Sequence, residues 1–171
     1  MKTNALSIAN YFIELADEKQ KDLTPLRLMK LVYISYGFGL ALLDKCFLDY
    51  RFDSVEAWRF GPVIPSVYHS FKRFGKQKIT EKTTMLVGTE QNYDIVTPEL
   101  EDSDAKKICK LVWDRYEGCD TGTLINILHG KGTPWAQVYE EGKNNPIPEL
   151  YTRMYYDSLV DRMKRYTDEH A

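Results

Sequence analysis

The spacing of apolar residues predicts a chain made mainly of helices. Near the N-terminus, Ile8, Phe12 and Ala16 recur at intervals of three or four, which predicts an amphipathic helix over 4–19. The next stretch, 26–43, is apolar on nearly every side, and a surface helix could not tolerate this pattern. Polar residues and two glycines interrupt the run, so we expect a buried central helix rather than a membrane span.

Capping residues and prolines mark where further helices begin. Thr24 precedes Pro25 and Thr133 precedes Pro134; in both pairs the threonine oxygen can accept a free backbone amide, and proline at the first helical position loses no hydrogen bond. Other helices are expected from Pro65 to Gly75, from Asp102 or Ser103 to Gly118, from Thr121 or Thr123 to Gly130, from Pro134 to Gly142, and from Pro148 onward. Gly37 and Gly39 inside the central helix are expected to let another backbone approach closely.

Two segments show strand features instead. Residues 47–59 mix β-branched, aromatic and charged residues, and Gly61-Pro62 is expected to end this extended segment. Two apolar clusters in 85–96, joined by the polar link 88–92, predict a hairpin that should pack on the helices, because an isolated hairpin is only marginally stable. The predicted fold class is mainly α: a single compact domain over 1–171, with about seven helices and a small β-hairpin or short-strand element.

Charge and cysteine content narrow the environment and the partners. The chain has 23 basic and 25 acidic residues and a net charge of -2, so nucleic acid is not the expected partner. The three cysteines, Cys46, Cys109 and Cys119, lie far apart without a Cys-x-x-Cys pair, which is typical of reduced thiols. Without a signal-peptide core, the sequence favours a cytoplasmic protein that does not insert into a membrane.

Few residues suit catalysis. The histidines are His69, His129 and His170, and no phosphate-binding glycine loop, nucleophile elbow or zinc-type spacing accompanies them. We therefore expect no enzyme activity, no catalytic residues, no metal and no cofactor. His129 is expected to bond a final carbonyl of its short helix, His69 to be a half-exposed helix residue, and His170 to lie in a disordered terminal tail.

Two further groups of residues each leave two readings open. The basic residues Lys72, Arg73, Lys76 and Lys78 are interpreted as a solvated helix end, with a nucleic-acid contact as the alternative. Tyr151, Tyr155, Tyr156 and Tyr166 can belong to the core or anchor an interface, and their periodicity does not separate the two.

Three stretches together resemble a known family. They are LTPLRLMKLVY at 23–33, AWRFGPVIPSVY at 57–68, and Leu128-His129 followed by Thr133-Pro134-Trp135. In order and spacing they are similar to the Panacea domain, a phage-associated family of GepA-like and SocA-like antitoxins, and the resemblance extends over about 5–157. It implies a mostly helical fold, encoded beside diverse toxins, that acts by direct contact with a cognate toxin.

The resemblance also supplies the candidate site residues. Nine shared residues are expected to be mainly structural: Thr24, Pro25, Lys30, Tyr33, Gly61, Pro62, Val67, Tyr68 and Pro134. The candidates for a partner-binding groove are Trp58, Phe60, His69, His129 and Trp135, because each brings a large or polar-tipped side chain near a turn. The predicted function is toxin neutralisation by direct binding. The alternatives are a proteolytic adaptor that delivers the toxin to a protease, and a nucleic-acid-binding repressor.

Overall fold

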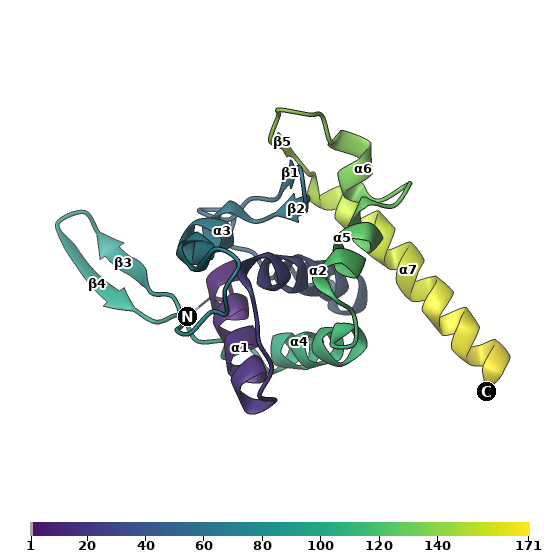
Figure 1. Ribbon diagram of the computed structural model, residues 1–171, viewed down its shortest axis with the longest axis horizontal. Helices are drawn as coiled ribbons and strands as arrows, with labels where there is room; N and C mark the ends of the chain where they lie inside the picture. The colour runs from purple at the N-terminus through teal and green to yellow at the C-terminus, as the bar shows by residue number, and fades with distance from the viewer. Residues whose placement is uncertain (1) are drawn as a thin grey trace.

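The computed structural model describes residues 2–171 and has the predicted mainly helical architecture (Figure 1). The helices are α1 (Ala5–Glu18), α2 (Pro25–Leu43), α3 (Pro65–Phe71), α4 (Ser103–Tyr116), α5 (Thr121–His129), α6 (Pro134–Val138) and α7 (Glu149–His170), with a 3-10 turn, η1 (Lys72–Phe74), after α3. The strands are β1 (Glu56–Trp58), β2 (Gly61–Val63), β3 (Met85–Thr89), β4 (Asn92–Val96) and β5 (Asn145–Pro146). The expected disordered tail at His170 is wrong, because α7 continues to that residue and the His170 ring stacks on Tyr166.

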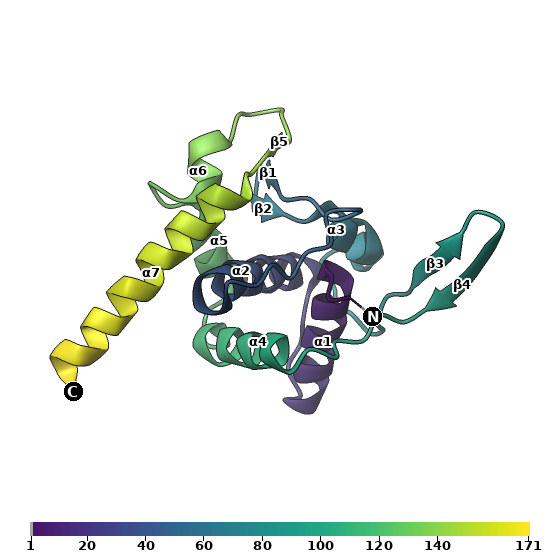
Figure 2. The same ribbon diagram turned by 180° about the vertical axis from the view of Figure 1, so that it is seen from behind.

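Helix α2 is the centre of the fold, as its all-round apolar pattern predicts. Helices α1, α3, α4, α5 and α7 all contact it (Figures 1 and 2). It is long and apolar enough to cross a membrane by length and composition, yet 72% of its most apolar window is buried inside the protein. The same pattern therefore serves here as the core of the helical domain.

The two glycines of α2 allow close contact with aromatic rings, not with another backbone as expected. A Cβ atom on Gly37 would lie 2.3 Å from the ring of Tyr156 on α7. A Cβ atom on Gly39 would lie 2.6 Å from the ring of Phe47. Both rings are buried, so each glycine is a place where a bulky side chain rests directly on the helix.

Most helix starts follow the capping rules. The Asp102 and Thr133 side chains accept backbone amides at the starts of α4 and α6, as predicted. Helix α5 begins at Thr121 as predicted, and the carboxylate of Asp120 caps it. Thr24 precedes α2, but its side chain makes no capping hydrogen bond, so that part of the prediction is wrong. Helix α6 also ends earlier than expected, at Val138.

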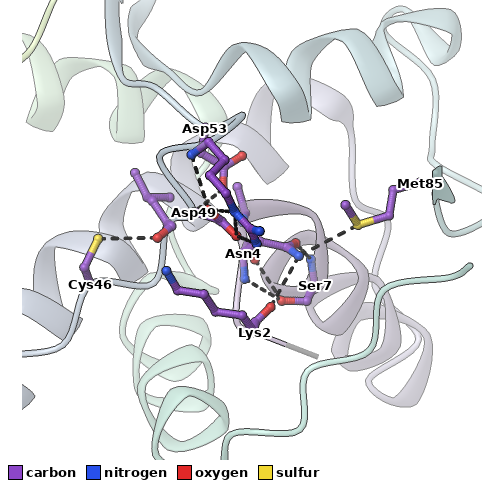
Figure 3. A network of polar contacts seen from close by, with 10 residues as sticks. Lys2, Asn4, Ser7, Cys46, Asp49, Asp53 and Met85 are labelled. Carbon is purple, nitrogen blue, oxygen red and sulfur yellow. Dashed lines mark hydrogen bonds and ion pairs between the residues drawn. The ribbon is translucent and has the colours of Figure 1, made fainter. Parts of the chain in front are cut away.

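A polar network fixes the N-terminus of α1 to two loops (Figure 3). The Asn4 side chain accepts from the Ser7 amide at 2.9 Å, and the Ser7 hydroxyl accepts from the Asn4 amide at 3.1 Å. The buried Asp53 carboxylate accepts from the amides of Ala5 and Asp49 at 3.0 and 2.9 Å. It also accepts from the Ser66 hydroxyl at 2.7 Å, so one carboxylate joins α1, the loop after α2 and α3.

A small antiparallel sheet with strand order β2-β1-β5 contacts α2 through β2. Strand β1 forms within the predicted extended segment, and Trp58 pairs with Gly61 across a tight turn. Gly61-Pro62 was expected to end the extended structure, but these residues begin β2. Proline fits because it has no amide to donate and this strand lies at the sheet edge.

The predicted second hairpin exists as β3 and β4, but it does not pack on the helices. It projects from the body as an arm (Figures 1 and 2), and Leu86 and Ile95, which face each other across the strands, are 61% and 68% exposed. The reason lies at its base, where the Asn10 amide group donates to the carbonyls of Thr83 and Pro98, both at 3.0 Å. These bonds hold the two ends of the segment on α1, and the strands between them extend into solvent.

Candidate functional site

A pocket of about 310 Å³ opens between α2, the β1–β2 hairpin and the α3–η1 segment. Its apolar walls are formed by Leu26, Met29, Trp58, Phe60, Val63 and Tyr68. The helix supplies Leu26 and Met29 one turn apart, while the hairpin and α3 supply the aromatic side chains. Residues from two of the three stretches that resemble the Panacea domain therefore meet at one hollow.

The aromatic side chains of this pocket are held in two different ways. Trp58 meets the Tyr68 ring edge-on, with ring centroids 4.8 Å apart, and donates from Nε1 to the Glu56 carboxylate at 2.7 Å. Phe60 lies at the β1–β2 turn and is 54% exposed, with the guanidinium of Arg59 5.5 Å from its ring centroid. Trp58 is thus a fixed wall, whereas Phe60 is an apolar surface available to a partner.

A second aromatic group, from α5, α6 and the residue after α6, contacts the β1–β2 hairpin. Trp135 stacks between His129, at 3.8 Å and nearly parallel, and Tyr139, at 4.4 Å. Its Nε1 donates to the backbone carbonyl of Trp58 at 2.7 Å. His129 therefore stacks on an indole ring, and the expected hydrogen bond from its side chain to a final carbonyl of α5 is absent among residues 2–171.

Lys30 places a buried amine beside this site. The residue is fully buried, lines the pocket, and donates from Nζ to the Pro62 carbonyl at 3.2 Å. Burial lowers the pKa of Lys30 to about 7, because no carboxylate compensates the lost hydration. The amine lies directly against Gly61, whose φ is +106° and where a Cβ would lie 3.0 Å from Nζ.

His129 shares this buried polar region with Lys30. Its Nε2 would lie 3.3 Å from a Cβ on Gly61, and it has no hydrogen-bond partner of standard geometry in the described part of the chain. Burial lowers the pKa of His129 first and the charge of Lys30 lowers it further, while the Phe60 backbone partly offsets both effects. The neutral imidazole is therefore favoured.

The five partner-binding candidates separate into three positions. Trp58 and Phe60 line the pocket, and His129 and Trp135 lie behind the hairpin that forms it. His69 is exposed on α3 and meets Tyr68 edge-on at 5.1 Å without lining the pocket. The fold therefore brings four of the five candidates, all except His69, to the β1–β2 hairpin or to side chains that contact it.

The residues expected to be structural occupy varied positions. Thr24 precedes α2, Pro25 and Pro134 begin helices, Gly61 and Pro62 form β2, Val67 is buried, and Tyr33 contacts the Thr152 hydroxyl at 3.1 Å. Pro25, Lys30 and Tyr68 also line the pocket. Four more lining residues were not among the predicted groove residues, although Lys72 was named as part of the basic cluster: Leu26, Met29, Arg59 and Lys72. The available signal was the spacing of Leu26 and Met29 within the family-like stretch 23–33.

Within residues 2–171, no three His, Cys, Asp or Glu side chains are arranged to hold a metal ion. Cys46, Cys109 and Cys119 are all free thiols, and burial raises the pKa of Cys109 to about 12.

Comparison with known proteins gives the family. The chain is 27% identical over 135 residues to Antitoxin SocA from Caulobacter vibrioides (strain NA1000 / CB15N), covering 79% of this chain and 70% of that protein. No solved structure matches it. The family described as "Antitoxin SocA-like, Panacea domain" matches residues 28–136, a span that contains all five partner-binding candidates. Because the match covers more than half of the chain, this chain belongs to the SocA-like antitoxin family of the Panacea domain.

Proposed function

We propose that the chain neutralises a cognate toxin by binding it directly, and that the pocket beside Trp58 and Phe60 is the contact surface. Membership of the SocA-like family supports an antitoxin role and so implies a toxin as partner. The direct contact and its location are our inference from the geometry.

The exposure of Phe60 at the mouth of the apolar pocket carries the proposal. A large aromatic side chain in water beside a hollow of about 310 Å³ presents both an anchor and a socket to another protein. Trp58 behind it is held by hydrogen bonds from two directions, one from its indole to Glu56 and one from Trp135 to its carbonyl. A rigid aromatic surface loses little conformational entropy when a partner binds.

The proposed mechanism is masking of the toxin, with no catalytic step and no cofactor. A nucleic-acid repressor is a weaker proposal because the basic cluster is partly neutralised. Arg73 pairs with Glu81 at 2.8 Å and Lys78 pairs with Asp22 at 3.3 Å, so two of its four cations already face carboxylates. A strong electrostatic attraction for phosphates needs several free cations together.

Coexpression with the protein encoded by the neighbouring gene, as the candidate toxin, tests the proposal. We expect the chain to restore growth and to copurify with the toxin, and Phe60→Ala to weaken the complex by about tenfold or more, as aromatic anchors do. Phe52→Ala is the matched control, because Phe52 is 43% exposed but lies outside the pocket. Failure of the unchanged chain to rescue growth or to copurify would refute the proposal.

A proteolytic adaptor would need the same contact but a different outcome. The half-life of the toxin in cells with and without this chain separates the two. Masking predicts an unchanged or longer half-life, and delivery to a protease predicts a shorter one.

A further inference from the structure

The pocket has positive charges and no negative ones among its lining residues. Lys30, Arg59 and Lys72 line it, and no Asp or Glu does. None of these three cations has an ion pair in the part of the chain that the structure describes, whereas Lys45, Arg51, Arg73 and Arg153 all face carboxylates elsewhere. Three cations without an ion pair among the described residues are thus gathered at the pocket where Phe60 is exposed.

The three cations differ in depth. Arg59, at the β1–β2 turn, and Lys72, in η1, are exposed, so their charged groups are available at the mouth of the pocket. Lys30 lies beneath them, fully buried, with one hydrogen bond to a backbone carbonyl. The Glu56 carboxylate contacts the wall residue Trp58 and already accepts its indole hydrogen.

We infer that the pocket receives an acidic segment of the toxin, in which an Asp or Glu carboxylate meets Arg59 and Lys72 at the mouth while a neighbouring large apolar side chain fills the cavity. This inference rests on the proposed function and specifies the chemistry of the partner. A cavity of about 310 Å³ is at the small end of binding pockets, which suits one side chain rather than a folded element.

The charge arrangement favours such a ligand on physical grounds. An apolar side chain in the cavity removes water from the mouth, and ion pairs strengthen when water is excluded. A carboxylate there is attracted by two cations directly and by the buried Lys30 through the low-dielectric interior. A basic or neutral segment would leave the charges of Arg59 and Lys72 uncompensated, so the arrangement also provides specificity.

Charge reversal at the mouth is the first test. We expect R59E/K72E to weaken binding of the adjacent-gene toxin by about tenfold or more, with most of the loss at low salt. The matched control is K21E/K110E, which makes the same change in net charge at two exposed lysines that have no ion pair among residues 2–171 and do not line the pocket. Binding by R59E/K72E equal to that of the control would overturn the inference.

A peptide scan of the toxin identifies the segment. Short overlapping peptides covering the toxin are measured against the unchanged chain, together with copies in which each Asp or Glu is replaced by its amide. We expect binding to concentrate in peptides with a carboxylate next to a large apolar residue, and to fall in the amide copies and with R59E/K72E. Binding that survives amide replacement would contradict the inference.

The two proposals fail in distinguishable ways. If the unchanged chain neither binds nor neutralises the toxin, the proposed function fails. If Phe60→Ala weakens binding but R59E/K72E does not, the aromatic contact stands and the acidic segment is refuted. Two other results with R59E/K72E would also overturn the inference, provided that toxin binding stays intact. Loss of self-association would assign the pocket to a second copy of the chain. Loss of oligonucleotide binding would assign it to phosphates.

Discussion

Lys30 is the residue whose position is hardest to explain by stability alone. Burying an amine without a carboxylate is unfavourable, and a single hydrogen bond to Pro62 compensates only part of the lost hydration. A methionine would fill similar space without that cost. The amine therefore reduces stability while it supplies charge to the pocket, which is a compromise common at binding sites.

Replacing Lys30 tests this cost through its pH dependence. The folded pKa of Lys30, about 7, is below the unfolded value of about 10.4. The penalty for burying it is therefore complete below pH 7 and disappears as the pH rises toward 10, because the unfolded chain binds a proton that the folded chain lacks. We expect Lys30→Met to be more stable than the unchanged chain by about 1–3 kcal/mol at pH 7, with a smaller difference at pH 9.

Urea unfolding of both proteins at pH 7 and pH 9 gives the two differences. Tyrosines titrate mainly above this range and are common to both proteins, so they cancel in the comparison. A methionine variant that is less stable at pH 7, or a difference that grows with pH, would contradict the assignment of Lys30 as a buried, costly amine.

At the scale of single residues, the sequence predicts local features well and burial less well. The Asp102 and Thr133 caps could be predicted because a cap depends on the next few residues only. The burial of Lys30 could not, because α2 is apolar on nearly every side and its pattern does not show which neighbours surround each position. Local prediction also fails at Thr24, which is a favourable N-cap residue but makes no side-chain hydrogen bond to the start of α2.

At the scale of elements, the existence of a hairpin was predictable but its packing was not. Two apolar clusters joined by a polar link specify β3 and β4 through local pairing, so the strands formed where expected. Whether a hairpin packs on the body depends on distant anchors such as Asn10, which no local pattern reveals. The pocket has the same character, since its walls come from α2, the β1–β2 hairpin and α3.

The exposed arm predicts an unusual tolerance to polar substitution. We expect Leu86→Thr combined with Ile95→Thr to change the free energy of unfolding by no more than about 0.5 kcal/mol, because both side chains stay mostly exposed to water in the folded protein. Ile79→Thr, at a buried position, should cost about 1–3 kcal/mol in the same assay. Comparable losses from both changes would mean that the arm packs on the body in solution.

At the scale of the whole molecule, α7 joins distant parts of the chain to the core. It contacts α2 (Figure 1). Tyr156 on α7 fits against Gly37, and its ring is edge-on to the rings of Phe38 and Tyr33. The Tyr33 hydroxyl meets Thr152 on the same face at 3.1 Å. The sequence did not separate a core role from an interface role for Tyr151, Tyr155, Tyr156 and Tyr166. In the structure, Tyr156 is buried and Tyr166 is exposed.

The contact at Gly37 is therefore expected to control how firmly α7 is attached. Alanine is favoured over glycine inside a helix by about 1 kcal/mol, but its Cβ would lie 2.3 Å from a buried ring that neighbouring rings prevent from moving. Overpacking of this kind costs about 1–3 kcal/mol, so we expect Gly37→Ala to lower the free energy of unfolding despite its better helix propensity. Gly118→Ala is the control, because a Cβ there meets nothing within 4 Å. Thermal unfolding of both variants checks the prediction, and a stabilised Gly37→Ala would show that α7 does not rest on α2 as described.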